Sequence, residues 1–278
     1  MRTHKPAVLA GVTAAVVAAL AIATALPGAQ APANAVPRLA DGTPNVNGIW
    51  QANNTANWNV LSHAARQGPM IALGAAFSIP GGLGIVEGNE IPYKPEAVAK
   101  QKENAEHWMT ADPEIKCYLP GVPRANYMPY PFQIVQSGKA SDILFAYEFA
   151  SGTRIVRMNT KTESPIDTWM GWSRGRWEGD ALVIDVSGFN GQAWFDRAGN
   201  YQSDRLHLVE RYTLTSADAI RYEATIEDPQ LYTRPWKISM PIYRRLEKDA
   251  QLVEYKCVEF AEELLYGDLV KRPKRPAN

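Results

Sequence analysis

The sequence of 278 residues contains two cysteines and four histidines, which is little material for a metal site. His63, His107 and His207 do not form a pair at a spacing that would bring two imidazoles together on one helix or strand, so zinc would need a wholly non-local site. The chain also lacks a nicotinamide or flavin fingerprint and a haem-attachment motif. We therefore expect no metal and no cofactor.

An excess of charge of either sign is also missing. Lysine and arginine number 29, aspartate and glutamate number 29, and the formal net charge is zero. Nothing in this balance steers the protein toward nucleic acid or an anionic surface. The basic run at 271–275 lies in a terminal segment, 270–278, which we expect to be a flexible tail.

The N-terminal stretch from Ala7 to Leu26 carries no charge and follows the basic residues Arg2 and Lys5. This pattern predicts a signal peptide over residues 1–35, with cleavage after Ala35. The alternative is an uncleaved anchor, because about 20 apolar residues are enough to span a bilayer. We expect a periplasmic or secreted protein with no stable membrane insertion once the leader is removed.

The two cysteines, Cys117 and Cys257, form an even count in a chain that we expect to be exported, which favours one disulfide. Closing so long a loop would stabilise the fold by roughly 4 to 5 kcal/mol in the chain-entropy model. The alternative is two separately buried thiols. No linker or internal repeat divides the rest, so we predict a single β-rich domain over 36–278.

Strand signals dominate from residue 132 onward. Short runs rich in β-forming residues alternate with Gly, Asp, Asn, Ser or Pro, which is typical of an antiparallel sheet rather than a βαβ fold. The nine expected strands are 132–136, 143–149, 154–158, 174–178, 182–186, 206–214, 220–227, 236–243 and 252–258. The clearest hairpin turns at Gly179 and Asp180.

The region before these strands has a different residue pattern. We expect a first strand near 44–50, a short helix at 58–67, a Gly-rich loop at 68–88, and a helix at 96–109 that Pro95 opens. Segment 53–110 would then form a loop and helix lid. The predicted fold is mainly β: an antiparallel up-and-down barrel or strongly curved sheet, lipocalin-like, with room for one small ligand.

Several strings carry a resemblance across nearly the whole chain after the leader. They include W-x-G-x-S-x-G-R-W-E-G-D at 169–180 and D-P-x-x-Y-T-x-P-W at 228–236, together with 84–93, 112–124 and 254–257. The sequence resembles a group of exported bacterial proteins known only as hypothetical proteins. The resemblance implies export and a single domain, and it implies no activity.

Gly171 to Gly175 match the G-x-S-x-G pattern of a nucleophile elbow around Ser173, and Asp196 and His207 follow in the order of α/β-hydrolases. That elbow needs a strand before the serine and a helix after it, whereas here a β-hairpin follows. The serine-hydrolase hypothesis therefore ranks below a simple turn serine. Asp196, Asn200 and Asp204 carry oxygens of the kind that bind calcium, but such residues in a loop more often form turns.

Acid–base chemistry is the leading functional hypothesis. His207 carries an imidazole, the side chain that enzymes most often use for proton transfer, and Arg211 follows on the same face of its strand, where it would stabilise an oxyanion or enolate. Asp196 or Asp185 would orient the imidazole, and Glu148 would be a second acid–base group if buried.

Aromatic residues surround these positions in the sequence and would suit a flat hydrophobic substrate. The candidates for substrate binding are Trp169, Trp172, Trp194, Tyr147 and Tyr212. The hypothesis is a cofactor-independent lyase or isomerase that encloses a small aromatic or terpenoid molecule. The alternative for the whole protein is a non-catalytic, lipocalin-like carrier. The alternative for each candidate residue is a structural role in the core or on the surface. The oligomeric state stays open.

Overall fold

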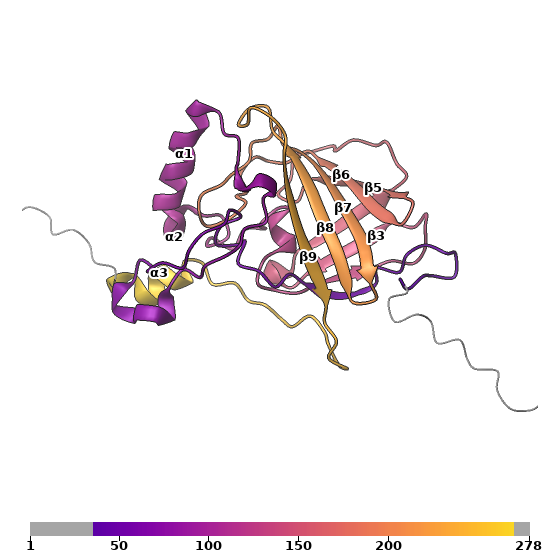
Figure 1. Ribbon diagram of the computed structural model, residues 1–278, viewed down its shortest axis with the longest axis horizontal. Helices are drawn as coiled ribbons and strands as arrows, with labels where there is room; N and C mark the ends of the chain where they lie inside the picture. The colour runs from indigo at the N-terminus through magenta and orange to yellow at the C-terminus, as the bar shows by residue number, and fades with distance from the viewer. Residues whose placement is uncertain (1–35, 270–278) are drawn as a thin grey trace, which may run out of the picture. The chain divides into compact units, whose positions relative to one another are not determined.

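A computed structural model describes residues 36–269, which form a closed barrel of nine strands (Figure 1). The strands are β1 Gly48–Gln51, β2 Phe132–Val135, β3 Ile143–Tyr147, β4 Thr153–Met158, β5 Trp172–Glu178, β6 Ala181–Ser187, β7 His207–Ser216, β8 Ala219–Glu227 and β9 Trp236–Arg244. The predicted barrel is confirmed. The predicted signal peptide (1–35) and tail (270–278) lie outside the described residues.

Strand pairing follows the chain order, and β1 closes the barrel by pairing with both β2 and β9. All neighbours are antiparallel except β4 and β5, which run parallel, with Val156 opposite Ser173. The expectation of an up-and-down barrel throughout is therefore wrong at this one junction. Segment 159–171 between these strands is long enough to carry the chain back to the end where β4 began, as a parallel pair requires.

Alternation along the strands separates an inner from an outer face. In β7, Leu208, Glu210 and Tyr212 are buried, whereas His207 and Arg211 are partly exposed. Large side chains that are essentially inaccessible fill the inside, namely Trp50, Phe132, Phe145, Tyr212 and Tyr222. The interior is thus a packed core, and it differs from the roomy chamber that the lipocalin-like prediction implied.

The last predicted strand, 252–258, is wrong. These residues adopt no regular secondary structure, and Cys257 within them is tied to Cys117. The physical reason is that β1 already fills the position between β9 and β2, so the closed sheet offers no free edge for another strand.

Helices are few and lie mostly between β1 and β2 in the chain. They are α1 Pro95–Glu106, α2 Trp108–Ala111 and α3 Ala261–Tyr266, with 3-10 turns at Ile71–Phe77, Glu87–Asn89, Arg124–Asn126, Phe149–Ser151 and Gly267–Leu269. Pro95 opens α1 as predicted, but the expected single helix is interrupted at His107. The short helix expected at 58–67 is absent, because that segment instead pairs with 79–82 through bridges from His63 to Gly82 and from Arg66 to Ile79.

The predicted disulfide is confirmed: Cys117 and Cys257 are bonded, with their Cα atoms 5.6 Å apart. Beyond it, α3 lies beside the turn at 71–77, where Phe77 and Tyr266 are in ring contact (Figure 1). A disulfide that joins two distant segments is compatible with an oxidising compartment.

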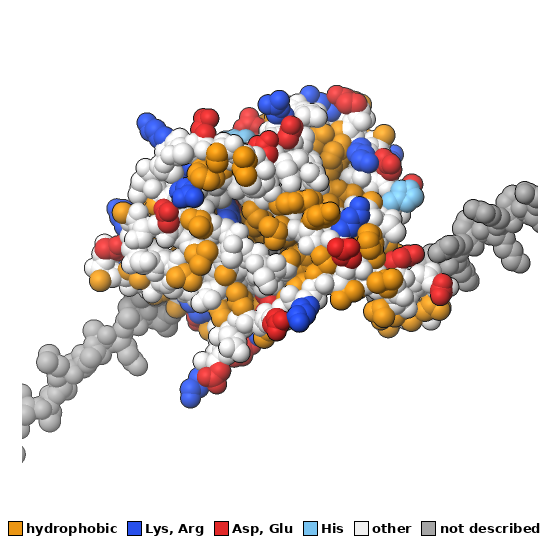
Figure 2. Space-filling model, turned by 180° about the vertical axis from the view of Figure 1, so that it is seen from behind, with side chains coloured by type: hydrophobic (Ala, Val, Ile, Leu, Met, Phe, Trp, Pro, Cys, Tyr) orange, Lys and Arg blue, Asp and Glu red, His pale blue; other side chains and the backbone are white. Residues whose placement is uncertain are grey.

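Charges of both signs are interspersed over the face shown in Figure 2, and hydrophobic side chains gather in a band across its middle. This agrees with the balanced composition. Among the described residues, no helix has the length and apolar character needed to cross a membrane.

The disulfide makes a testable contribution to stability. Replacing both cysteines by serine is expected to lower the free energy of unfolding by about 2 to 5 kcal/mol, because the unfolded chain regains the freedom that the cross-link removes. Urea denaturation monitored by tryptophan fluorescence measures the change. Wild-type protein unfolded in a thiol reductant should match the double variant, and equal midpoints for oxidised wild type and variant would contradict the prediction.

Candidate functional site

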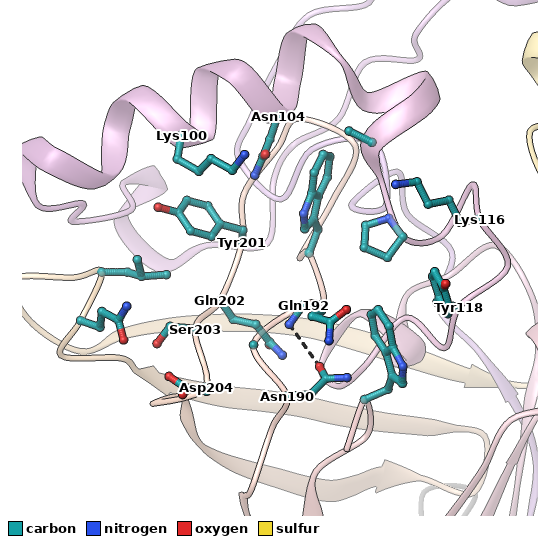
Figure 3. Close-up of a pocket in the computed structure, with 17 residues that line it drawn as sticks. Lys100, Asn104, Lys116, Tyr118, Asn190, Gln192, Tyr201, Gln202, Ser203 and Asp204 are labelled. Carbon is teal, nitrogen blue, oxygen red and sulfur yellow. Dashed lines mark hydrogen bonds between the residues drawn. The ribbon is translucent and has the colours of Figure 1, made fainter. Parts of the chain in front are cut away.

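A cleft of about 650 Å³ opens between α1 and the loops at 111–118 and 190–204 (Figure 3). We call it the α1 cleft. Its polar lining combines side-chain amides, from Asn104, Asn190, Gln192, Gln202 and Gln230, with the side chains of Lys100, Lys116, Ser203 and Asp204. Its aromatic lining comes from Tyr118, Trp169, Trp194 and Tyr201. Amides beside flat rings are typical of sites that bind small molecules by stacking and hydrogen bonding.

The loop that carries most of these residues is built around Asp196. This carboxylate is fully buried, and it accepts hydrogen bonds from the Val60 backbone (2.8 Å) and from the backbone and side chain of Asn200 (3.1 and 2.7 Å). Burial raises the pKa of Asp196 to about 6, although these hydrogen bonds oppose the rise. Asp196 therefore fixes the loop that supplies Tyr201 and Gln202.

The loop meets α1 at Gly199. This residue has a φ of +83°, and a Cβ there would lie 2.5 Å from both the Ala105 nitrogen and the Gln101 oxygen. Glycine thus permits both the backbone conformation and the close approach of the helix. Asn104 of α1 donates to the Gly199 oxygen (3.3 Å), which brings its side chain to the wall of the cleft.

Buried ion pairs hold the opposite wall. Arg124 binds Asp112 through two hydrogen bonds of 2.8 Å, and Arg197 binds Glu114 at 2.9 Å. Burial raises the pKa of Glu114 even though two guanidinium groups face it. The Arg197–Glu114 pair joins the 112–118 segment to the Asp196 loop, so the two sides of the cleft are fixed to one another.

Stacked rings form the aromatic surface. Tyr118 and Trp169 lie 4.8 Å apart and are nearly parallel, at 11°. Tyr201 stacks on Tyr93 at 6.1 Å and donates to the Ala97 oxygen of α1 at 3.3 Å. Because the rings are held by one another and by α1, they present preformed flat surfaces.

Gln202 is the most informative residue of the cleft. Its side chain is only 2% exposed, and its Nε2 has no hydrogen-bond partner among residues 36–269. In Figure 3 the amide points toward Asn190 and Gln192. A buried donor left unpaired costs about 1 to 3 kcal/mol, and here the donor belongs to a residue that lines the cleft.

A second cleft of about 550 Å³ lies on the other side of Trp169 and Asn190, which line both. We call it the Trp172 cleft. It is bordered by Trp172 and by the first half of β4, including Ile155, and its lining includes the buried residues Arg154 and Ser173. It sits where β4 and β5 begin their parallel pairing.

Below this cleft, a polar cluster occupies the barrel interior. Arg154 forms an ion pair with Glu210, and both side chains are at most 1% exposed. The other oxygen of Glu210 accepts from Asn126 (3.0 Å), Tyr212 (3.1 Å) and Tyr222 (2.7 Å). Burial, followed by the Glu210 charge, raises the pKa of both tyrosines, which therefore act as hydrogen-bond donors.

The structure separates the predicted acid–base residues. His207 and Arg211 lie on the outer face of the barrel, where His207 Nε2 is 2.9 Å from Asp185 and Arg211 pairs with Glu178 at 3.0 Å. Despite partial burial, hydrogen bonds from His207 and Arg174 hold the pKa of Asp185 below its usual value. Neither His207 nor Arg211 reaches the interior, so their expected place beside an enclosed substrate is wrong, while a catalytic role stays a prediction.

The other two acid–base candidates do not join them. Asp196 is the buried support of its loop, with Val60 and Asn200 as partners rather than His207. Glu148 accepts a hydrogen bond from the Val253 backbone at 3.1 Å. The four predicted catalytic residues therefore lie in three separate places, and only His207 and Arg211 share one, the outer face of β7.

Three of the five predicted binding aromatics line the clefts. Trp169 and Trp194 border the α1 cleft, and Trp172 borders the Trp172 cleft. Tyr147 and Tyr212 instead belong to the interior cluster, and both donate to or accept from Asn126. Burial raises the pKa of Tyr147 to about 12.

Sequence reasoning missed the amides, Gln202 above all. The residue types of the Asp196–Asp204 stretch predict turns, and nothing in them distinguishes an amide that faces a cleft from a turn residue.

The structure also shows the surroundings of Ser173. Its hydroxyl accepts a hydrogen bond from Arg154 Nε at 2.7 Å, and a guanidinium does not serve as a general base. Within the described part of the chain, no group of three His, Cys, Asp or Glu residues is placed to hold a metal ion.

The interior ion pair gives a stability prediction. Glu210→Ala leaves the Arg154 charge buried and unpaired, so the free energy of unfolding should fall by about 3 to 5 kcal/mol in urea denaturation. Glu178→Ala is the matched control, because its partner Arg211 is on the exposed face, and a loss of less than about 1 kcal/mol is expected. Equal losses in the two variants would contradict the difference in burial.

Asp196 predicts a pH dependence. The pKa of Asp196 is about 6 in the folded protein, whereas the ordinary pKa of an aspartate is 3.8. The folded state therefore holds more protons between these values, and stability from this group falls as the pH rises through them. The difference in unfolding free energy between wild type and Asp196→Asn should change by about 3 kcal/mol between pH 3.5 and pH 7, to the disadvantage of wild type at pH 7. Parallel pH curves for the two proteins would rule this out.

Comparison with known proteins adds no assignment. No protein-family model matches the sequence, and no curated protein was found to be similar to it. The function is therefore inferred from the geometry of the two clefts.

Proposed function

We propose that the protein binds a small polar molecule with a flat ring face in the α1 cleft. The observation that carries this proposal is the unpaired Nε2 of Gln202, a buried donor that borders a cleft with stacked aromatic walls. A ligand oxygen that accepts this hydrogen bond would remove the penalty of the unpaired donor. The β-barrel itself is consistent with a ligand-binding fold.

The amide lining favours a ligand that both donates and accepts hydrogen bonds. Each Asn or Gln side chain offers a carbonyl acceptor and two N–H donors in fixed positions. A hydroxyl group on the ligand satisfies either partner, whereas a purely hydrocarbon molecule would leave both unpaired. This chemistry supports a more polar ligand than the aromatic or terpenoid molecule expected from the sequence.

Binding without catalysis is better supported than lyase or isomerase chemistry. The residues expected to move protons, His207 and Glu148, do not line the α1 cleft, and the lining of that cleft is mainly amide and aromatic. The His207–Asp185 pair on the outer wall is the one observation that keeps the acid–base hypothesis as a second candidate. The serine-hydrolase alternative has no base beside Ser173 to support it.

We also propose that binding takes place outside the cytoplasm. The charge-free stretch from Ala7 to Leu26 and the Cys117–Cys257 disulfide both support export.

Gln202→Met tests the proposal, because methionine has a similar length and no donor. Stability should stay equal or rise by about 1 kcal/mol, since an unpaired buried donor is removed. Affinity for the molecule that co-purifies with the protein from its native host, identified by mass spectrometry and titrated by tryptophan fluorescence, should fall roughly tenfold, as expected for the loss of one buried hydrogen bond.

Gln136→Met is the matched control. Gln136 is also buried, but it lies away from both clefts and accepts a hydrogen bond from the Val46 backbone at 3.2 Å. This variant should be less stable than wild type and should bind the ligand equally well. Unchanged affinity in Gln202→Met, or the absence of any small molecule that binds wild type, would refute the proposed function.

A further inference from the structure

The two clefts are neighbours that share a wall. Trp169 and Asn190 line both of them, and both residues are partly exposed. Backbone hydrogen bonds hold Asn190 to Thr168, the residue before Trp169: the Thr168 nitrogen donates to Gly188 (3.0 Å), and the Asn190 nitrogen donates to Thr168 (2.9 Å). A molecule longer than the α1 cleft would therefore pass over Trp169 and Asn190 into the Trp172 cleft.

The Trp172 cleft has binding groups of its own. Its lining includes Arg154, a side chain that is 3% exposed and whose Nη1 has no partner within the described residues. The remaining nitrogens of Arg154 are occupied, Nε by Ser173 and Nη2 by Glu210, so its charge is already neutralised. What remains is a single donor suited to a hydroxyl or ether oxygen rather than to a second carboxylate.

The two clefts thus repeat one pattern. Each pairs an unpartnered, nine-tenths buried donor with a tryptophan, Gln202 with Trp169 in the first and Arg154 with Trp172 in the second. Each volume, about 650 and 550 Å³, lies in the range of roughly 300 to 1,000 Å³ in which proteins hold small ligands. A repeated site suits a ligand made of repeated units.

We infer that the ligand is an oligosaccharide of at least two rings, with one ring in each cleft and the linkage crossing Trp169. This inference rests on the proposed function and specifies its ligand class. A pyranose ring has an apolar face that stacks on an aromatic side chain and a rim of hydroxyl groups that pair with amides. The amides of the α1 cleft and the neutralised Arg154 match that chemistry, and the charged residues of the two linings, among them Lys116 and Arg157, also form hydrogen bonds with hydroxyl groups.

The test is the dependence of affinity on chain length, measured by isothermal titration calorimetry. The probes are the mono-, di- and trisaccharides of four series: glucose in β-1,4 linkage, galactose, N-acetylglucosamine and galacturonic acid. In at least one series the affinity should rise about tenfold or more from one ring to two, because the second ring gains its own hydrogen bonds. The galacturonate series distinguishes an acidic from a neutral ligand.

Ile155→Trp probes the second cleft without touching the first. Ile155 is 52% exposed at the border of the Trp172 cleft, and a larger ring there would fill it. Binding of the monosaccharide should be unchanged, whereas the gain from the second ring should disappear. Val135→Trp is the control, because Val135 is similarly exposed (43%) on β2, outside both clefts, and its binding should resemble wild type.

Each failure has a distinct meaning. An affinity that does not rise with chain length, or a gain that survives in Ile155→Trp, would overturn the two-cleft ligand. If no saccharide binds but the molecule retained from the native host does so in a Gln202-dependent manner, the inference fails and the proposed function stands. A retained peptide would also overturn the inference.

Discussion

The parallel pairing of β4 with β5 is the constraint on which the candidate site depends. In a closed sheet of otherwise antiparallel neighbours, one parallel junction needs a crossover, and segment 159–171 provides it. The end of that crossover carries Trp169, and its neighbour Thr168 forms backbone hydrogen bonds with the segment after β6. Both clefts share this residue, so they follow from a feature of strand direction rather than from an added domain.

The same junction explains why a charged cluster lies under the Trp172 cleft. The register places Val156 opposite Ser173, so pairing with β5 covers only the second half of β4. Arg154 therefore belongs to the half that borders the cleft, while its guanidinium points inward to Glu210. A buried pair of this kind contributes little net stability, because desolvation offsets the attraction, but it strongly disfavours arrangements that separate the partners.

Because the barrel interior is packed, the two clefts lie at its loops and strand ends. Phe132, Phe145 and Tyr222 fill the space that a lipocalin-like fold would leave open. The loops at the barrel end are instead held by buried polar contacts, among them Arg124 with Asp112 and Asp196 with Asn200. A cleft whose walls are fixed in this way needs little reordering when a ligand arrives, which favours affinity.

Much of the fold was predictable because it depends on local patterns. Strand alternation and turn residues predicted the barrel and the hairpin at Gly179, and an even cysteine count in a chain expected to be exported predicted the disulfide. The direction of β5 and the displacement of 252–258 by β1 depend on which edges meet when the sheet closes, and no local pattern reports that. The face of β7 that turns inward was equally undetermined, because each face carried charged residues, and this misplaced His207.

Unpaired buried donors do not mark a binding site by themselves. Trp236 Nε1, Trp177 Nε1 and Gln136 Nε2 are also without partners in the described chain, and none of these residues lines either cleft. What distinguishes Gln202 and Arg154 is that each borders open space beside an aromatic ring. A donor enclosed by the core is a fixed cost of packing, whereas a donor at a cleft wall can be satisfied by a ligand. The free energy recovered when a ligand pairs with a donor at a cleft wall adds to the affinity. An unpaired donor in that position therefore contributes to recognition.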